Sequence, residues 1–304
     1  MRQPLTFIAL LAGAGLLGAQ TGGPKTFSSP EEARDALVQA ASQGMGPLRE
    51  MMGIGAAEIL GTGDAVQDKA LIEQFQKRVA EKISLEPDPM NPGRVTVDIG
   101  NEEWPFAVPI VRKNGLWYFD AQEGKAELRR RIIGANELDA LEVCRGYVEA
   151  QEMYGATDWD NNGILQYATR FASTPGKKDG LYWPGDDSPI SEAIAKALAE
   201  GYTGAAVKSG GYHGYYYKIL LAQGPDAAGG AEDYVVHGFM IGGFALVAWP
   251  VEYGVSGIMT FMVNQDGVVY EKDLGRQTGT LAKAMTKFNP DKSWNVSPEI
   301  DLSN

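Results

Sequence analysis

The sequence of 304 residues contains one cysteine and only two histidines. A single thiol cannot form an internal disulfide, and so few imidazole and thiolate ligands exclude a zinc ribbon or a histidine-rich metal cage. Positive charge is also scarce, because 27 lysine and arginine residues stand against 39 aspartate and glutamate residues, for a formal net charge of -12. Nucleic-acid binding requires clustered lysine and arginine, so we expect no nucleic-acid partner.

The sequence also lacks an apolar run of the roughly 20 residues that a membrane-spanning helix needs. The apolar residues 5–17 follow the positive charge of Arg2 and precede the small residues Gly18 and Ala19. This order is typical of a secretory signal peptide. We therefore predict a signal peptide over residues 1–20 and a periplasmic or secreted mature protein with no stable membrane span. A retained anchor is the alternative.

The first part of the mature chain, residues 25–135, combines helical patterns with strand patterns. Ser29 followed by Pro30 is typical of a helix start, and Asn114-Gly115 is a strong hairpin signal. The predicted elements are helices at residues 30–41 and 65–82, an interruption at residues 44–47, and strands at residues 95–99, 108–113 and 116–120. These elements predict an α+β unit.

The second part of the chain, residues 136–304, is expected to form another α+β unit. Its predicted elements are helices at residues 136–154 and 191–200 and strands at residues 215–221, 244–249, 258–263 and 268–271. Cys144 lies on the apolar side of the first helix and is expected to be a core residue. The arginine run at residues 129–131 is expected to be solvated or paired with Glu127 and Glu137. The predicted fold class is α+β, with two units that each pack helices on an antiparallel sheet.

The most specific local motif consists of Asp158, Asp160, Asn162 and Gly163, which match the opening of a calcium-binding loop. Oxygen ligands at alternate positions and a glycine that permits a sharp turn suit this hard cation. The twelfth position of such a loop is a bidentate glutamate, whereas this sequence has Thr169. Two interpretations stay open, a weak calcium site and an Asx-rich turn. Calcium is the one cofactor that the sequence suggests.

Asp179, Asp186 and Asp187 flank the aromatic residues Tyr182 and Trp183. Glycoside hydrolysis uses two carboxyl groups at roughly 5 to 10 Å, and an aromatic platform beside acids is typical of many sugar sites. The three acids are therefore candidate catalytic residues, and the two aromatic residues are candidate binding residues. The alternative is that the acids cap loops and are solvated, because a chain with 39 acidic residues offers many such neighbourhoods.

Tyr215 and Tyr217 belong to a tyrosine-rich strand pattern and are further candidate binding residues. Exposed rings there would form a stacking surface for sugars or bases, although tyrosine is also an ordinary strand residue. His213 and His237 both adjoin glycine and are expected to be structural. No G-x-S-x-G motif and no G-x-x-x-x-G-K-[ST] phosphate loop occurs in the sequence.

Longer motifs are distributed along the mature chain. They are Trp104-Pro105-Phe106, DGLYWP at residues 179–184, YHGYYYKIL from Tyr212, GGFALVAWP from Gly242 and MTFMVNQDGVVYEKDLG from Met259. The motifs resemble a family of secreted bacterial proteins catalogued as domain of unknown function 2950. This resemblance covers nearly the whole mature chain and implies an exported protein, but it implies no reaction. The C-terminal half is more loosely similar to the globular heads of pilin-like and pseudopilin proteins.

These patterns favour an exported, non-catalytic binding protein or envelope-associated accessory factor whose partner is an envelope component or polymer. The alternative is an extracytoplasmic hydrolase that acts on glycan or cell-wall material with paired carboxylates. Two acids that face one pocket beside Tyr182 or Trp183, one of them buried, would favour the hydrolase. A sheet surface without such a cleft would favour binding.

Overall fold

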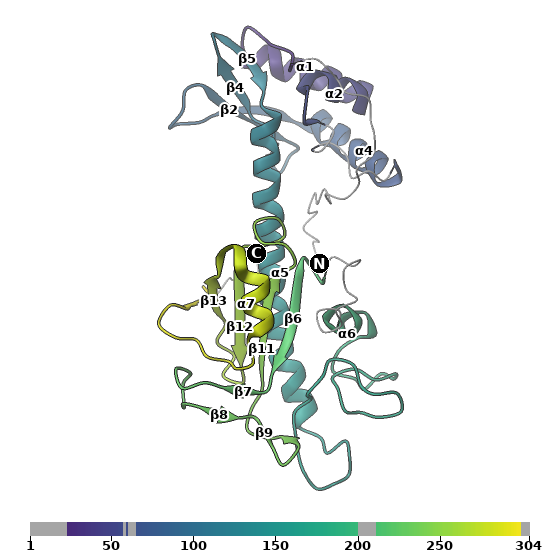
Figure 1. Ribbon diagram of the computed structural model, residues 1–304. Helices are drawn as coiled ribbons and strands as arrows, with labels where there is room; N and C mark the ends of the chain where they lie inside the picture. Colours follow the sequence, from purple (N-terminus) through teal and green to yellow (C-terminus); the bar gives the residue numbers. More distant parts are fainter. Residues whose placement is uncertain (1–22, 57–58, 60–64, 200–210, 299–304) are drawn as a thin grey trace. The chain divides into compact units, whose positions relative to one another are not determined.

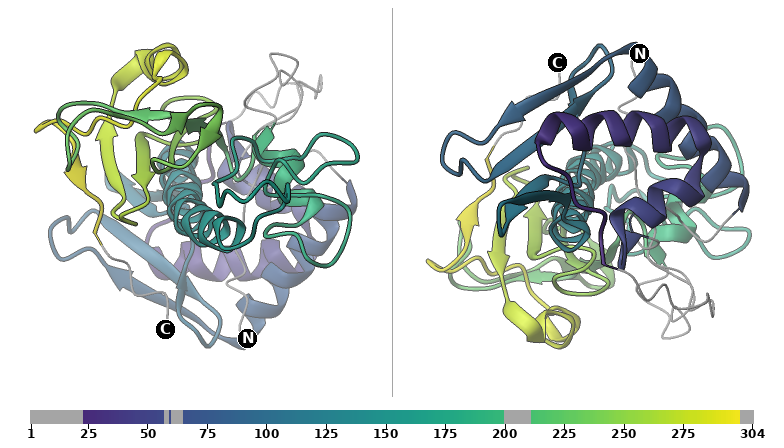
Figure 2. Two further views of the ribbon diagram at one scale, coloured as in Figure 1. Left: turned by 90° about the horizontal axis from the view of Figure 1, so that it is seen from below. Right: turned by 90° about the horizontal axis from the view of Figure 1, so that it is seen from above.

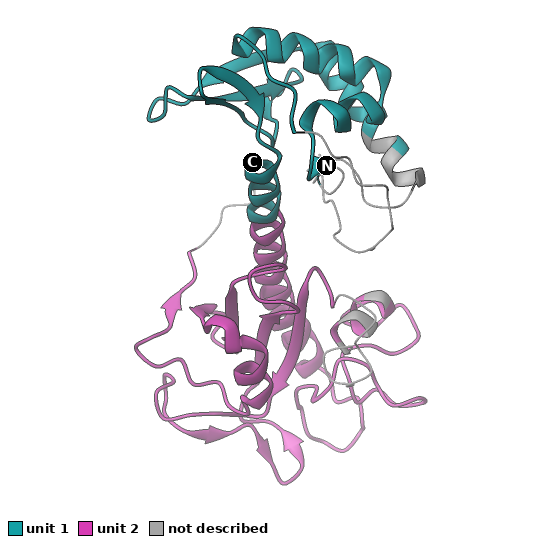
Figure 3. Cartoon of the chain, turned by 45° about the horizontal axis from the view of Figure 1, so that its top comes forward, with its two compact units in different colours: residues 1–131 teal, residues 132–304 magenta. Residues whose placement is uncertain are grey.

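The computed structural model describes residues 23–56, 59, 65–199 and 211–298 (Figure 1). The predicted signal peptide lies outside these described residues. The chain divides into two compact units, residues 1–131 and 132–304, which are coloured separately in Figure 3. Each unit combines helices with an antiparallel sheet, so the predicted α+β class is confirmed.

Unit 1 begins with helices α1 (Pro30–Gln43), α2 (Met45–Met52) and α4 (Ala65–Glu81). The hydroxyl oxygen of Ser29 accepts a hydrogen bond from the Glu32 backbone N–H at 3.1 Å, which is the cap that the sequence predicts. The expected interruption occurs at Gly44 alone and does not extend to residue 47. Gly44 ends α1 with a φ of 100°, and α2 then begins at once, because its first turn tolerates Pro47.

The sheet of unit 1 is antiparallel and has the order β1-β2-β4-β5, with β3 paired to β2. Its strands are β1 (Ile83–Pro87), β2 (Arg94–Ile99), β3 (Trp104–Pro105), β4 (Ile110–Lys113) and β5 (Leu116–Phe119). Asn114 and Gly115 join β4 to β5 with φ values of 54° and 85°, so the predicted hairpin is confirmed. Val97 and Phe119 of the sheet are fully buried in one cluster with Leu37 of α1.

A single helix, α5 (Ala121–Gly155), contains the point at which the two units divide. The helix expected to start at residue 136 starts at Ala121 instead. One carboxylate oxygen of Asp120 accepts the backbone N–H groups of Gln122 and Glu123, both at 3.0 Å, and so caps the helix. The expected start depended on apolar periodicity, whereas polar and charged residues form the first turns.

The main sheet of unit 2 is antiparallel and has the order β14-β13-β12-β11-β6. Its strands are β6 (Tyr215–Leu220), β11 (Ala245–Pro250), β12 (Met259–Asn264), β13 (Tyr270–Asp273) and β14 (Asn295–Val296). The sheet lies between α5 and helix α7 (Thr278–Ala284), as Figures 1 and 2 show. Because both faces are covered, every residue of β11 is buried.

Two short strand pairs lie in the connection between β6 and β11. They are β7 (Ala222–Gln223) with β8 (Glu232–Asp233), and β9 (Val235–Val236) with β10 (Phe239–Met240). A 3-10 turn, η2 (Gly275–Gln277), precedes α7. These elements extend unit 2 beyond the main sheet.

The core of unit 2 joins α5 to the sheet. Leu141, Cys144 and Tyr147 of α5 lie in the same buried cluster as Leu246 of β11. Cys144 is fully buried, and desolvation raises the pKa of its thiol to about 12. The prediction that Cys144 is a core residue is confirmed.

The partners of the arginine run agree only in part with the sequence prediction. Arg130 and Arg131 lie inside α5 and pair with Glu127 at 2.7 and 2.9 Å, as expected. Glu137 has a different role, because its carboxylate accepts the Met259 backbone N–H at 3.0 Å at the start of β12. Glu137 thus fixes a strand end to α5.

The other side of α5 carries residues 156–191 and helix α6 (Glu192–Ala199), which Figure 2 shows opposite the sheet. Gln151 of α5 is fully buried. Its side-chain oxygen accepts the Ala168 backbone N–H and its side-chain nitrogen donates to the Ala168 carbonyl, both at 2.8 Å.

No helix in the described part of the chain is both long and apolar enough to cross a membrane.

Candidate functional site

The carboxylate of Asp179 holds the loop in which it lies. It accepts hydrogen bonds from the Thr174 backbone N–H at 2.7 Å and from the Thr174 hydroxyl at 2.8 Å, and Arg170 lies 3.8 Å away. Partial burial acts to raise the pKa of Asp179, but the bonds from Thr174 and the positive charge of Arg170 outweigh it and lower the pKa. A general acid that works near neutral pH needs the opposite shift.

Asp187 is engaged in a similar way. Lys178 Nζ donates to it at 2.5 Å and Trp183 Nε1 at 2.6 Å, and these two bonds lower the pKa of its carboxyl group. Asp186 is exposed to solvent. A groove of about 420 Å³ lies along α5, and none of the three candidate acids lines it. The positions of these acids therefore give the hydrolase hypothesis no support.

The aromatic candidates Tyr182 and Trp183 are also occupied within the protein. Trp183 is buried, and its ring centroid lies 4.7 Å from that of Trp159. Lys178 Nζ lies 4.4 Å from the Trp159 centroid and 4.8 Å from the Trp183 centroid, so the chain's own ammonium group contacts both rings. The Tyr182 backbone N–H donates to the Phe171 carbonyl at 2.9 Å, and its side chain is half-buried.

Tyr215 and Tyr217 lie on the face of β6 that is directed into the core, and both side chains are fully buried. The Tyr215 hydroxyl donates to the Met259 carbonyl at 3.0 Å, and burial raises the pKa of both tyrosines well above the ordinary value. The prediction that these two rings form a ligand-binding surface is therefore wrong. Strand alternation identifies two faces, but it does not show that a helix covers the tyrosine face.

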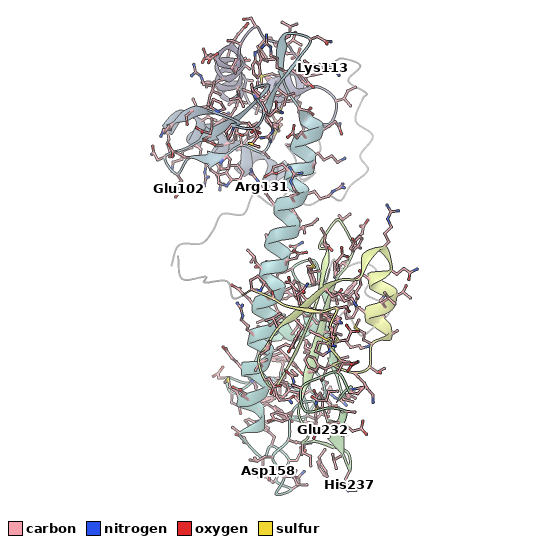
Figure 4. The ribbon with its side chains drawn as sticks, turned by 90° about the vertical axis from the view of Figure 1, so that its left-hand side faces the viewer. Glu102, Lys113, Arg131, Asp158, Glu232 and His237 are labelled. Carbon is pink, nitrogen blue, oxygen red and sulfur yellow. The ribbon has the colours of Figure 1, made fainter. Side chains whose placement is uncertain are left out.

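The aspartates of the calcium-like motif form a turn just beyond α5, where Figure 4 labels Asp158. The two carboxylate oxygens of Asp158 accept the backbone N–H groups of Asn162 at 3.2 Å and Gly163 at 2.8 Å. Asp160 accepts a bond from the Gln166 side chain at 2.9 Å. These contacts are those of an Asx-rich turn. Among the described residues no group of three or more His, Cys, Asp or Glu side chains could hold a metal ion, and calcium binding stays a prediction.

The described residues of unit 2 form a groove along α5 with a volume of about 420 Å³. We call it the α5 groove. Its lining residues are Asp139, Glu142, Val143, Gly146, Tyr147, Glu149, Leu181, Pro189, Ile190, Ser191, Ile194, Leu198, Tyr212 and His213. Successive turns of α5, the segment that leads into α6, and the turn before β6 each contribute one side of it.

His213 enters the groove from a tight turn. Tyr212 and Tyr215 exchange backbone hydrogen bonds at 2.9 and 3.1 Å, and the two residues between them, His213 and Gly214, have φ values of 49° and 73°. This is the geometry of a two-residue hairpin turn that favours asparagine and glycine. The turn directs His213 Nδ1 to within 2.7 Å of Asp139 Oδ2 on α5.

Among the described residues, the His213–Asp139 pair has no third member of a nucleophilic triad. Ser191 lines the same groove, but its hydroxyl oxygen accepts the Ile194 backbone N–H at 3.4 Å at the start of α6. No hydrogen bond joins Ser191 to His213 among the described residues. Since a nucleophile must lie within hydrogen-bond reach of its base, the groove suits binding better than acyl transfer.

The groove combines an apolar floor with an acidic rim. Val143, Ile190 and Ile194 are partly exposed apolar side chains on the floor. Glu142 and Glu149 are exposed at the rim, and within the described residues neither forms an ion pair or a side-chain hydrogen bond. Such an arrangement can bury an apolar group and attract a positively charged one.

Unit 1 contains a larger and more open cavity of about 560 Å³. Its lining includes Ile54, Leu116 and Tyr118, with Lys113 and Asp120 as its charged groups. Asp120 is engaged as the cap of α5, which leaves Lys113 as the one charged side chain of this cavity without a hydrogen bond or ion pair among the described residues.

The sequence did not point to the α5 groove. Its acidic residues lie on a helix at ordinary spacing, and its other two sides come from residues 181–198 and 212–213. One local signal on its α5 side is Gly146, because a glycine inside a helix is less stable than alanine. His213, expected to be structural, pairs with Asp139 at the rim.

A family model described as "Protein of unknown function (DUF2950)" matches residues 24–297. The chain belongs to this family. The matched range contains all residues that line the α5 groove, and the family description assigns no activity. No curated protein and no solved structure matches the chain. The similarity to pilin heads therefore stays a resemblance of sequence pattern.

Proposed function

We propose that this member of the family is an exported, non-catalytic binding protein that serves the cell envelope as an accessory factor, with the α5 groove as its binding site. The observation that carries the proposal is the combination of an apolar floor with the unpaired carboxylates of Glu142 and Glu149. A groove of about 420 Å³ lies within the range of small-ligand and side-chain sites.

The chemistry of the candidate acids supports binding rather than hydrolysis. Asp179 and Asp187 have lowered pKa values, caused largely by hydrogen bonds that favour their ionised forms. A glycosidase acid is kept protonated by a raised pKa. His213 has a carboxylate partner in Asp139, but the described residues place no nucleophile beside it.

The export part of the proposal depends on the amino-terminal sequence. Residues 5–17 are apolar, follow a positive charge and precede small residues, as in a cleaved secretory signal peptide. The net charge of -12 agrees with a partner whose contacting region is neutral or positively charged.

The experiment is affinity capture from the envelope fraction of the native cells with residues 23–304 as bait. Three baits are compared: the natural sequence, Glu142→Lys/Glu149→Lys, and the control Glu102→Lys/Glu152→Lys. Both control glutamates are exposed and unpaired in the described structure, and Figure 4 labels Glu102. The two double variants change the net charge equally.

We expect the natural and control baits to retain the same envelope component, chemically unchanged in mass, and the groove variant to lose it. Equal retention by all three baits would contradict the proposed site. Recovery of a cleaved component would contradict the non-catalytic role, and capture of no component by the natural bait would contradict binding.

A further inference from the structure

Gly146 lies in the middle of α5, on the side that lines the groove. Glycine inside a helix destabilises it relative to alanine, because it loses more backbone entropy on folding. Two other glycines of α5 have a steric reason. A Cβ at Gly124 would lie 2.7 Å from Val108 Cγ2, and one at Gly155 would lie 2.9 Å from Tyr167 Cε1. At Gly146 nothing lies within 4 Å of such an atom.

The fold therefore does not require a glycine at position 146. What the glycine provides is an open helix surface between Glu142 and Glu149, where a bound group can reach the backbone of α5 closely. Gly134, on the same helix, also has open space around it but does not line the groove. It serves below as the matched control.

The two unpaired glutamates set the charge and the length of the occupant. Glu142 and Glu149 are two helical turns apart, which corresponds to about 10 Å along the axis of α5. Arg145 lies between them on the helix, but it does not line the groove and pairs with neither. In an extended polypeptide the first, third and fifth side chains point to the same side and span about 13 Å. Long, flexible basic side chains at the first and fifth positions would reach both carboxylates, with an apolar side chain between them.

The floor between the two glutamates selects apolar groups. Val143 of α5 faces Ile190 and Ile194 across the groove, and all three side chains are partly exposed. Burial of apolar side chains against them contributes favourable free energy in proportion to the area removed from water. A segment with apolar residues between two basic ones fits both features.

We propose that the α5 groove binds an extended polypeptide segment in which basic side chains flank apolar ones, and that Gly146 is the point where this segment approaches the helix backbone. This inference rests on the function proposed above and names the chemical class of its partner. The segment lies over α5, with its basic groups at Glu142 and Glu149 and its apolar groups on the floor.

The test is a titration of residues 23–304 with two short peptides, acetyl-Lys-Leu-Leu-Leu-Lys-amide and acetyl-Glu-Leu-Leu-Leu-Glu-amide, monitored by NMR chemical shifts. We expect the lysine peptide to shift resonances of Val143, Gly146 and Ile194, and to bind at least about tenfold more tightly than the glutamate peptide. The double substitution Glu142→Gln/Glu149→Gln should lower the affinity for the lysine peptide about three- to tenfold. The control Glu102→Gln/Glu152→Gln should leave its affinity unchanged.

Gly146→Ala and Gly134→Ala separate binding from stability. Both substitutions should raise Tm by about 1–3 °C, because alanine is the better helix residue at an open position. Gly146→Ala should lower the affinity for the lysine peptide by about threefold or more, whereas Gly134→Ala should leave this affinity unchanged. Equal peptide affinity in these two variants would overturn the role assigned to Gly146.

Equal binding of the two peptides, or shifts located outside the groove, would overturn the polypeptide assignment. If capture of the envelope component still depends on Glu142 and Glu149 in that case, the binding function stands and only the class of partner is wrong. If capture is independent of both glutamates, the binding function and this inference fail together.

Discussion

Asp179 binds its own loop more strongly when it is ionised, because Thr174 donates two hydrogen bonds to its carboxylate. The same bonds explain why a sequence motif of acids beside aromatic rings is not a catalytic pair. Asp187 likewise joins Lys178 to Trp183. At the scale of single residues, an unpaired carboxylate such as that of Glu142 indicates a binding site better than the paired carboxylates of Asp179 and Asp187 do. No positive group among the described residues pairs with Glu142.

Asp179→Asn should therefore destabilise unit 2 in a pH-dependent way. The folded-state pKa of Asp179 lies below its unfolded value of about 3.9, so its stabilisation is fully present above that value and is lost as the pH falls through the folded pKa. We expect the variant to lose about 1–2 kcal/mol at pH 7 and less at pH 2.5, measured by denaturant unfolding.

Asp186→Asn is the matched control for this prediction. Asp186 is exposed, and the substitution should change the free energy of unfolding by less than about 0.5 kcal/mol at either pH. A loss at Asp179 that has the same size at both pH values would show that its charge is not what stabilises the loop.

At the scale of elements, local signals in the sequence predicted those parts of the fold that depend on neighbouring residues. The Ser29 cap and the Asn114-Gly115 hairpin are formed by residues adjacent in the chain, and both are confirmed. The start of α5 was missed, because Asp120 caps it without an apolar pattern to mark the first turns. Tyr215 and Tyr217 were candidate binding residues, although α5 covers their face of the strand.

The groove itself could not be predicted from local patterns. Three segments far apart in the sequence form its sides, and the pairing of His213 with Asp139 depends on their packing. Whether a carboxylate such as Glu149 has a partner is likewise a property of the folded chain. The α+β class needed only periodicity and was therefore accessible.

One buried amide of α5 helps to hold residues 156–191 on the helix. Gln151 accepts the Ala168 N–H and donates to the Ala168 carbonyl and to the Tyr147 hydroxyl, at 2.8, 2.8 and 2.9 Å. Gln151→Leu should leave both backbone groups of Ala168 buried without partners and lower the free energy of unfolding by about 2–4 kcal/mol. Denaturant unfolding measures the loss.

Gln166→Leu is the control for this change. Its amide bonds the exposed Asp160, so the loss should be below about 1 kcal/mol. Similar small losses in both variants would show that Gln151 does not hold residues 156–191 to the helix.

At the scale of the whole molecule, a role in the envelope requires that the chain leaves the cytoplasm. The net charge of -12 and the apolar residues 5–17 are the sequence features that bear on this. We expect fractionation of the native cells to place the protein in the periplasm or the medium. Mass spectrometry of the purified protein should show that its amino terminus has been cut near residue 20.

Leu11→Arg should break the apolar run and leave the uncut chain in the cytosol. Ser293→Arg, a charge change at an exposed residue of unit 2, is the control and should not alter export. Cytosolic location of the uncut natural chain would contradict the envelope role while leaving the groove geometry as it is.

The most direct measurement of the central claim is photo-crosslinking in the native cells. Tyr212 lines the α5 groove and Tyr253 does not, and both are partly exposed tyrosines of unit 2. Each is replaced in turn by p-benzoylphenylalanine in the full chain, and adducts are resolved by mass. The account predicts a discrete adduct from position 212 and none from position 253. The same adducts from both positions, or no adduct from position 212, would contradict it.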